Sequence, residues 1–81
     1  SQITIYPNPV SDVLNVEWEF PDVVNVQLTD ASGRSVYTRN FDEPSTSVEI
    51  SLAPEPTGIY ILHVQTHEGT LSKKIVKGFA D

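Results

Sequence analysis

The sequence contains no cysteine and no methionine among its 81 residues. Without cysteine there is no disulfide, no thiolate ligand for a metal and no cysteine nucleophile. A chain of this length forms one domain at most, and packing alone has to stabilise it. Because the chain starts with Ser1 rather than methionine, we expect it to be a piece, or a processed product, of a longer protein.

Basic residues are scarce, with five Lys and Arg against eleven Asp and Glu and a net charge of −6. This balance argues against nucleic-acid binding, which needs a basic face to meet phosphates. No apolar run approaches the roughly 18 residues that would span a membrane. Three of the five cations, Lys73, Lys74 and Lys77, gather near the end of the chain. From composition alone, we interpret them as solubilising charge on the exposed face or edge of a last strand.

No segment shows a period of 3.6 residues over a helical length, so we expect no helix. A period of two recurs instead. It predicts seven short strands, at residues 3–5, 13–20, 24–29, 35–41, 46–52, 59–66 and 70–77. Such strands, separated by frequent turn signals, indicate an all-β antiparallel sandwich of two sheets. A small closed barrel fits less well, because the proline-rich breaks leave sheet edges.

The connections carry recognisable turn chemistry. In "DASGR", residues 30–34, Asp30 can cap a hairpin turn through its side chain and Gly33 can supply a positive φ. "APEPTG", residues 53–58, is predicted to be a rigid connection that ends at Gly58. The strand that follows is apolar on both faces in its first half, which favours a central position in its sheet.

"YPNP", residues 6–9, places two prolines one residue apart between the first two strands. Proline cannot donate to a strand ladder, and it pushes the residue before it toward an extended conformation. We therefore expect a stiff, extended segment that leads to the next strand, with the other sheet as one destination. A structural role accounts for it fully, and we favour that role over direct recognition by a partner.

Candidate catalytic and metal sites are weak. His63 and His67 are four residues apart, about 13 Å along a strand, which is too far to share one metal. Glu17 and Glu19 alternate with apolar residues and fit a solvated strand face. The sequence from Asp30 to Gly33 has too few oxygen ligands for a calcium loop. No serine lies in a nucleophile elbow. We expect no catalytic, metal or cofactor site, and so no enzyme.

Trp18 can be interpreted in two ways, as a sugar-binding residue on the surface or as a core residue. An exposed tryptophan would be a platform for a sugar ring, and the chain would then be an accessory carbohydrate-binding or adhesion module. However, Trp18 is in phase with Leu14, Val16 and Phe20, which favours a place in the core.

Three motifs in order resemble one known family. "IYPNPVSDVLNVE" near the start, "LTDASGRSVY" in the middle and "TGIYILHVQTHEGTLSKKIVK" near the end are similar to the C-terminal sorting domain of the type IX secretion system of Bacteroidetes. The resemblance covers nearly the whole chain, residues 3–77. Each motif alone is weak, and three at this order and spacing are specific.

The resemblance implies a β-sandwich of immunoglobulin-like shape at the C-terminus of a larger secreted protein. It implies no catalysis. Such a domain directs a cargo, fused to its N-terminus, through the periplasm and across the outer membrane to the cell surface or the medium. Its partners would be the type IX machinery and a sortase-like surface protease that removes the domain.

Carried over by position, the resemblance assigns residues of this chain to the family's motifs. They are Tyr6, Pro7, Asn8, Pro9, Asp30, Gly33, Arg34, Gly58, Tyr60, Lys73, Lys74 and Lys77. We hypothesise that the last strand and its three lysines contact the secretion machinery. Residues 78–81 follow the last lysine as a short tail, where chains of the family usually stop. We expect a monomer, with an edge-paired dimer as the alternative.

Overall fold

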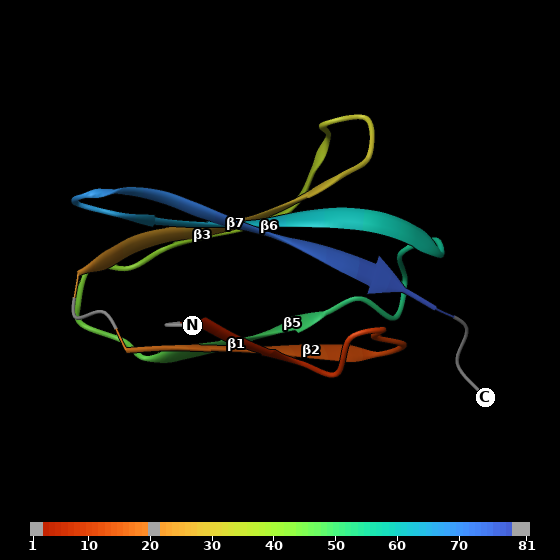
Figure 1. The fold of residues 1–81 in the computed structure, drawn as a ribbon, viewed down its shortest axis with the longest axis horizontal. Helices are drawn as coiled ribbons and strands as arrows, with labels where there is room; N and C mark the ends of the chain where they lie inside the picture. Colours follow the sequence, from red (N-terminus) through yellow and green to blue (C-terminus); the bar gives the residue numbers. More distant parts are fainter. Residues whose placement is uncertain (1–2, 20–21, 79–81) are drawn as a thin grey trace.

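The structure is a computed structural model that describes residues 3–19 and 22–78, and every element in these ranges is a strand. The seven strands are β1 (Ile3–Tyr6), β2 (Val13–Trp18), β3 (Val23–Asp30), β4 (Ser35–Asn40), β5 (Ser47–Ser51), β6 (Gly58–Thr66) and β7 (Gly69–Lys77). They form two layers (Figure 1), one ordered β1-β2-β5 and the other β4-β3-β6-β7, and neighbouring strands within each layer are antiparallel. The described part of the chain contains no helix able to span a membrane.

The predicted antiparallel sandwich is confirmed, and the predicted strands differ from the observed ones mainly at their ends. The second strand, expected over residues 13–20, ends at Trp18. Phe20, which was expected in phase with it, and Pro21 lie outside the described residues.

The core follows directly from the period of two. Alternate residues of a strand face the same side, so Leu14, Val16 and Trp18 all point between the layers and are at most 3% exposed. Val26 and Leu28 of β3 meet them from the other sheet as part of the same cluster. Each such side chain contributes about 1.5–3 kcal/mol on burial.

β6 is central in the four-stranded sheet, as its apolar sequence predicted. It pairs with β3 on one side, where Leu28 lies opposite Leu62, and with β7 on the other, where Ile75 lies opposite Tyr60. The edge strands of this sheet are therefore β4 and β7, and those of the three-stranded sheet are β1 and β5.

Residues 6–9 end β1 and lead to the next strand, as predicted, but that strand lies in the same sheet, because β1 and β2 pair directly, from Tyr6 opposite Asn15 to Ile3 opposite Trp18. The predicted extended path is wrong, because the segment is bent at residues 7–9. The Tyr6–Pro7 and Asn8–Pro9 peptide bonds are both cis. The prolines thus end β1 and help to turn the chain back toward β2.

Candidate functional site

The middle motif forms the hairpin between β3 and β4, and the carboxylate of Asp30 organises it. Oδ1 accepts hydrogen bonds from the backbone N–H groups of Ser32 and Arg34, each at 3.0 Å, and from the Ser32 hydroxyl at 2.7 Å. Oδ2 accepts from Arg34 Nε at 3.1 Å. The Ser32 hydroxyl, the two N–H groups and the Arg34 side chain lower the pKa of Asp30, against the opposing effect of desolvation. Gly33 has a φ of 92°, as the turn chemistry predicted.

The late motif lies beside this hairpin. Tyr60 of β6 is the strand partner of Asp30 and is only 3% exposed. Its hydroxyl donates to the carbonyl of Pro56 in the connection before β6. Burial raises the pKa of Tyr60, and the charges of Glu55 and Asp30 add to the rise. Gly58 begins β6 with a φ of 148°, which an L side chain rarely adopts.

Glu55 joins the middle motif to the last strand. Its carboxylate lies 3.9 Å from Arg34 Nη2, and its backbone carbonyl accepts a hydrogen bond of 3.0 Å from Lys77 Nζ. Lys77 is only 7% exposed and is the strand partner of Gly58. Its stem is buried and its ammonium is held by the protein, so Lys77 is not part of an exposed lysine surface.

The early motif docks on the same strand. The Asn8 side-chain amide accepts a 3.0 Å hydrogen bond from the N–H of Val76 through Oδ1, and Nδ2 lies 3.4 Å from the carbonyl of Lys74. Val10 continues the contact, because its N–H donates to Val76 at 2.8 Å and its carbonyl accepts from Gly78 at 2.8 Å. We call residues 8–10, docked on residues 74–78, the clasp.

Tyr6 lies outside the clasp, on the outer face of the three-stranded sheet. It is 44% exposed, and its hydroxyl donates to Glu17 of β2. That hydrogen bond raises the pKa of Tyr6, and the nearby charges of Glu17 and Glu49 add to the effect. Tyr6 and Glu17 are thus polar neighbours on a solvated face, as predicted for Glu17.

All three motifs therefore meet at one end of the sandwich. We call it the motif end: it contains the clasp, the β3–β4 turn and the connection before β6. In Figure 1 this end is on the right, where β7 slants from its own layer toward the β1–β2 connection. A hollow of about 250 Å³ opens there, and four of its lining residues belong to the predicted set, namely Asp30, Arg34, Gly58 and Tyr60.

Lys73 and Lys74 are the two predicted lysines that remain exposed. Lys73 lies just before the clasp on β7, and Lys74 lies at the margin of the clasp, where its carbonyl is 3.4 Å from Asn8 Nδ2. Within the described ranges neither forms an ion pair. The arrangement can therefore offer two positive side chains to a partner, rather than the three expected from the sequence.

Sequence reasoning missed two residues of the motif end, Val10 and Glu55. Val10 is fully buried although it follows a polar, proline-rich segment, and its valine side chain was the available signal. Glu55 lies between two prolines in a connection and gave no signal, because its contacts with Arg34 and Lys77 come from distant parts of the chain.

His63 and Trp18, which were considered for other sites, have hydrogen-bond partners within the fold. His63 is half-buried between hydroxyls, 3.1 Å from Thr29 Oγ1 and 3.2 Å from Ser72 Oγ, while His67 lies in the β6–β7 turn. Trp18 is buried: its indole N–H donates to the carbonyl of Ser45 at 2.6 Å, and its ring meets Phe41 edge-on at 5.5 Å. It is the predicted core residue and offers no sugar platform.

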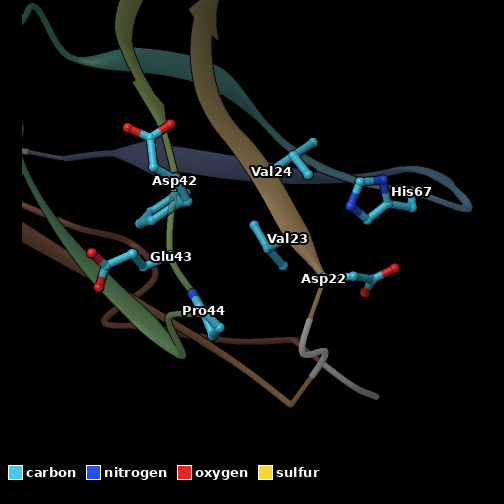
Figure 2. A pocket seen from close by; sticks show the side chains of 8 residues that line it. Asp22, Val23, Val24, Asp42, Glu43, Pro44 and His67 are labelled. Carbon is cyan, nitrogen blue, oxygen red and sulfur yellow. The ribbon is translucent and has the colours of Figure 1, made fainter.

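A second hollow, of about 230 Å³, lies at the opposite end of the sandwich, and acidic residues line part of it. Figure 2 shows that the carboxylates of Asp22, Asp42 and Glu43 point in different directions, with His67 at the rim. In residues 3–19 and 22–78, no group of three or more acidic or histidine side chains converges on a point that could hold a metal ion.

Comparison with known families identifies the chain. The family model described as "Secretion system C-terminal sorting domain" matches residues 4–78. The chain belongs to this family. The match covers all three motifs and confirms the resemblance to type IX sorting domains, a family whose domains are sorting signals rather than catalysts.

Solved structures support the fold of this sorting domain. A DUF3244 family protein from Bacteroides vulgatus, described as having an immunoglobulin-like β-sandwich fold, matches with a TM-score of 0.75 and 25% sequence identity. The match covers 95% of the present chain and 85% of that protein. No curated protein matched the chain. The predicted immunoglobulin-like sandwich is therefore confirmed.

Proposed function

We propose that this sorting domain directs a cargo, fused to its N-terminus, across the outer membrane through the type IX secretion system. The cargo would pass through the periplasm and reach the cell surface or the medium. The domain acts as a folded address that the type IX machinery recognises. A sortase-like surface protease then removes it, cutting on the cargo side of the folded domain.

The observation that carries this proposal is the family match over residues 4–78, which spans the motif end completely. Within that match, the motif residues divide into two groups. Asn8, Asp30, Tyr60 and Lys77 bond mainly to other parts of the chain, so their role is to shape the domain. Lys73 and Lys74 have exposed side chains, and they are the residues that contact the machinery.

A transplant tests the proposal. Residues 1–81 are fused to the C-terminus of a fluorescent reporter with an export signal peptide. The fusion is expressed in a Bacteroidetes strain with an intact type IX system and in a matched strain without it. We expect the reporter outside the first strain and in the periplasm of the second. Periplasmic retention in both, with the domain shown to be folded, would contradict the proposal.

The cleavage step needs its own readout. In the strain that exports the fusion, loss of the 81-residue domain from the released reporter is followed by mass spectrometry. We expect released reporter that lacks the domain. Exported reporter that retains the complete domain would leave export standing and reject cleavage.

A further inference from the structure

β7 is an edge strand, and its backbone groups that point away from β6 fall into two stretches. One stretch is hydrogen-bonded and the other is not. In an antiparallel pair, alternate residues direct both backbone groups away from the neighbouring strand. Val76 directs its N–H and carbonyl to Asn8 and Val10, on the side away from β6. The register between β6 and β7 is continuous from Gly58–Lys77 to Thr66–Gly69. Lys74, Ser72 and Thr70 therefore direct their backbone groups to the same side.

The clasp forms hydrogen bonds with one of these stretches of β7, as a neighbouring strand would. The Asn8 side chain is an amide, like a peptide group, and it reaches from the N–H of Val76 to the carbonyl of Lys74. Val10 then bridges Lys77 in parallel register. The chain thus covers the edge of β7 from the carbonyl of Lys74 to its C-terminal end with its own groups.

The other stretch is open. Within the described ranges, no hydrogen bond is made by the outward N–H of Lys74 or by the outward N–H and carbonyl groups of Ser72 and Thr70. Unpaired backbone groups in a row are a template for another strand, and peptide recognition by strand addition uses such edges. We call residues 70–74 the open edge.

The two basic side chains that have no partner in the described residues, Lys73 and Lys74, belong to this open edge. Of the five basic residues, Arg34 pairs with Asp30, Arg39 lies 4.9 Å above the ring of Phe41, and Lys77 donates to Glu55. Lys73 and Lys74 have no such partner in the described part of the chain, although eleven acidic residues are present in the sequence. The open edge is thus a basic site on an acidic domain.

The two faces of the open edge differ. Lys73 lies opposite the buried Leu62 and so shares the core side with Leu71, which is 41% exposed. Lys74 shares the outer side with Ser72, whose hydroxyl contacts His63. An added strand would therefore meet a lysine and an apolar side chain on one face, and a lysine with polar groups on the other.

We infer that the protein recognising this domain adds an extended acidic segment to the open edge as an extra strand. Carboxylates on both faces of that segment pair with Lys73 and Lys74, and an apolar side chain two residues away packs on Leu71. The backbone of the segment forms hydrogen bonds with Thr70, Ser72 and Lys74, in the stretch of β7 next to the clasp. This inference rests on the proposed sorting function and specifies the chemistry of the partner.

Charge favours such a segment over a second copy of the chain. An antiparallel pair of open edges would bring four unpaired lysines into one short stretch. Like charges in that arrangement repel, whereas carboxylates on the added strand attract. Self-association is therefore an alternative that the test has to report.

Two substitutions of Ser72 distinguish the contribution of its backbone N–H from that of its side chain. Ser72→Pro removes the outward N–H and leaves the bonds to β6 in place, since proline is tolerated where the N–H of an edge strand faces solvent. Ser72→Ala loses the same hydroxyl and keeps the N–H, so it is the matched control. In the reporter fusion, we expect export of Ser72→Pro to be at least about fivefold lower than export of Ser72→Ala.

Charge reversal provides a second variant that does not disturb the backbone. We expect Lys74→Glu to lower export at least about fivefold. Arg39→Glu changes the net charge equally at β4, the other edge of the same sheet, and should leave export near the wild-type level. Thermal unfolding of each purified chain confirms that the variant is folded before its export is scored.

A binding measurement addresses the chemistry directly. The ¹⁵N-labelled chain is titrated with the peptide acetyl-Thr-Glu-Glu-Thr-Val-Thr-amide, and with a version in which both Glu are Lys. We expect the acidic peptide to shift the amide signals of Thr70, Ser72 and Lys74 most and the basic version to shift none. Equal binding of both peptides, or shifts centred elsewhere, would overturn the inference.

The outcomes distinguish the two proposals. If the wild-type fusion is not exported, the sorting function itself fails. If the wild type is exported and Ser72→Pro and Lys74→Glu match it, only strand addition fails. A concentration-dependent dimer in sedimentation that Ser72→Pro abolishes, with export unchanged, would assign the open edge to self-association and reject an acidic partner.

Discussion

The two ends of this sandwich are stabilised by different chemistry. At the motif end, polar side chains bond to the backbone of other elements: Asn8 to β7, Lys77 to Glu55 and Tyr60 to Pro56. At the opposite end, one such bond, from the Trp18 indole to Ser45, is combined with aromatic packing, in which Trp18 lies edge-on to Phe41. A hydrogen bond to a chosen backbone group requires one residue type at one position, whereas burial accepts many apolar residues. Recognisable motifs therefore gather at the end that polar bonds stabilise.

The largest effect is expected at the aromatic end. Trp18→Ala should lower the free energy of unfolding by about 3–5 kcal/mol, because it removes a large buried ring and leaves a cavity. Trp18→Phe retains most of the packing and loses only the bond from the indole N–H to Ser45. Chemical denaturation measures both. Equal losses in the two variants would show that the hydrogen bond, and not packing, stabilises this end.

Lys77 should give the next largest effect. Lys77→Met keeps the buried stem and deletes the ammonium that donates to the Glu55 carbonyl, so we expect a loss of about 1–3 kcal/mol. The matched variant Lys73→Met, at an exposed position of the same strand, should change stability by less than about 0.5 kcal/mol. Similar unfolding curves for the two variants would contradict a structural role for Lys77.

Asn8→Ala should cost less, about 0.5–1.5 kcal/mol, because the groups it leaves on β7 are close to solvent. Its clearest sign should be faster hydrogen exchange of the Val76 amide, which donates to Asn8 Oδ1. Asn8→Asp keeps an acceptor and loses the amide donor, so it should preserve the protection of Val76. Unchanged exchange in Asn8→Ala would mean that the clasp does not depend on the side-chain amide.

The smallest effect is expected for Asp30, in the exposed hairpin, and it depends on pH. The folded-state pKa of Asp30 lies below the ordinary value of 3.8. The ionised carboxylate therefore stabilises the fold above that value, and this contribution is lost as pH falls through the folded pKa. Asp30→Asn should be less stable than wild type at neutral pH, and the difference should shrink in acid. A difference independent of pH, in thermal unfolding, would exclude ionisation as the cause.

Much of the fold could be predicted from the sequence, because the period of two reports which face of a strand is buried. Leu14, Val16 and Trp18 illustrate this. Asp30 and Gly33 could also be placed, since turn chemistry acts over a few neighbouring residues. The burial of Lys77 and the docking of Asn8 could not. Both depend on which residues of distant strands lie side by side. That is set by the pairing register of the strands, which could not be read from the sequence.

The clasp also has a consequence for the order in which the domain is completed. Asn8 is separated from its partners Lys74 and Val76 by 66 and 68 positions, so the contact closes a loop of nearly the whole chain. During synthesis from the N-terminus, Asn8 and Val10 have no strand to dock on until β7 has been made. Closure of the clasp therefore reports that the last strand is present and paired. The clasp is thus a contact that the domain can make only after all seven strands have been synthesised.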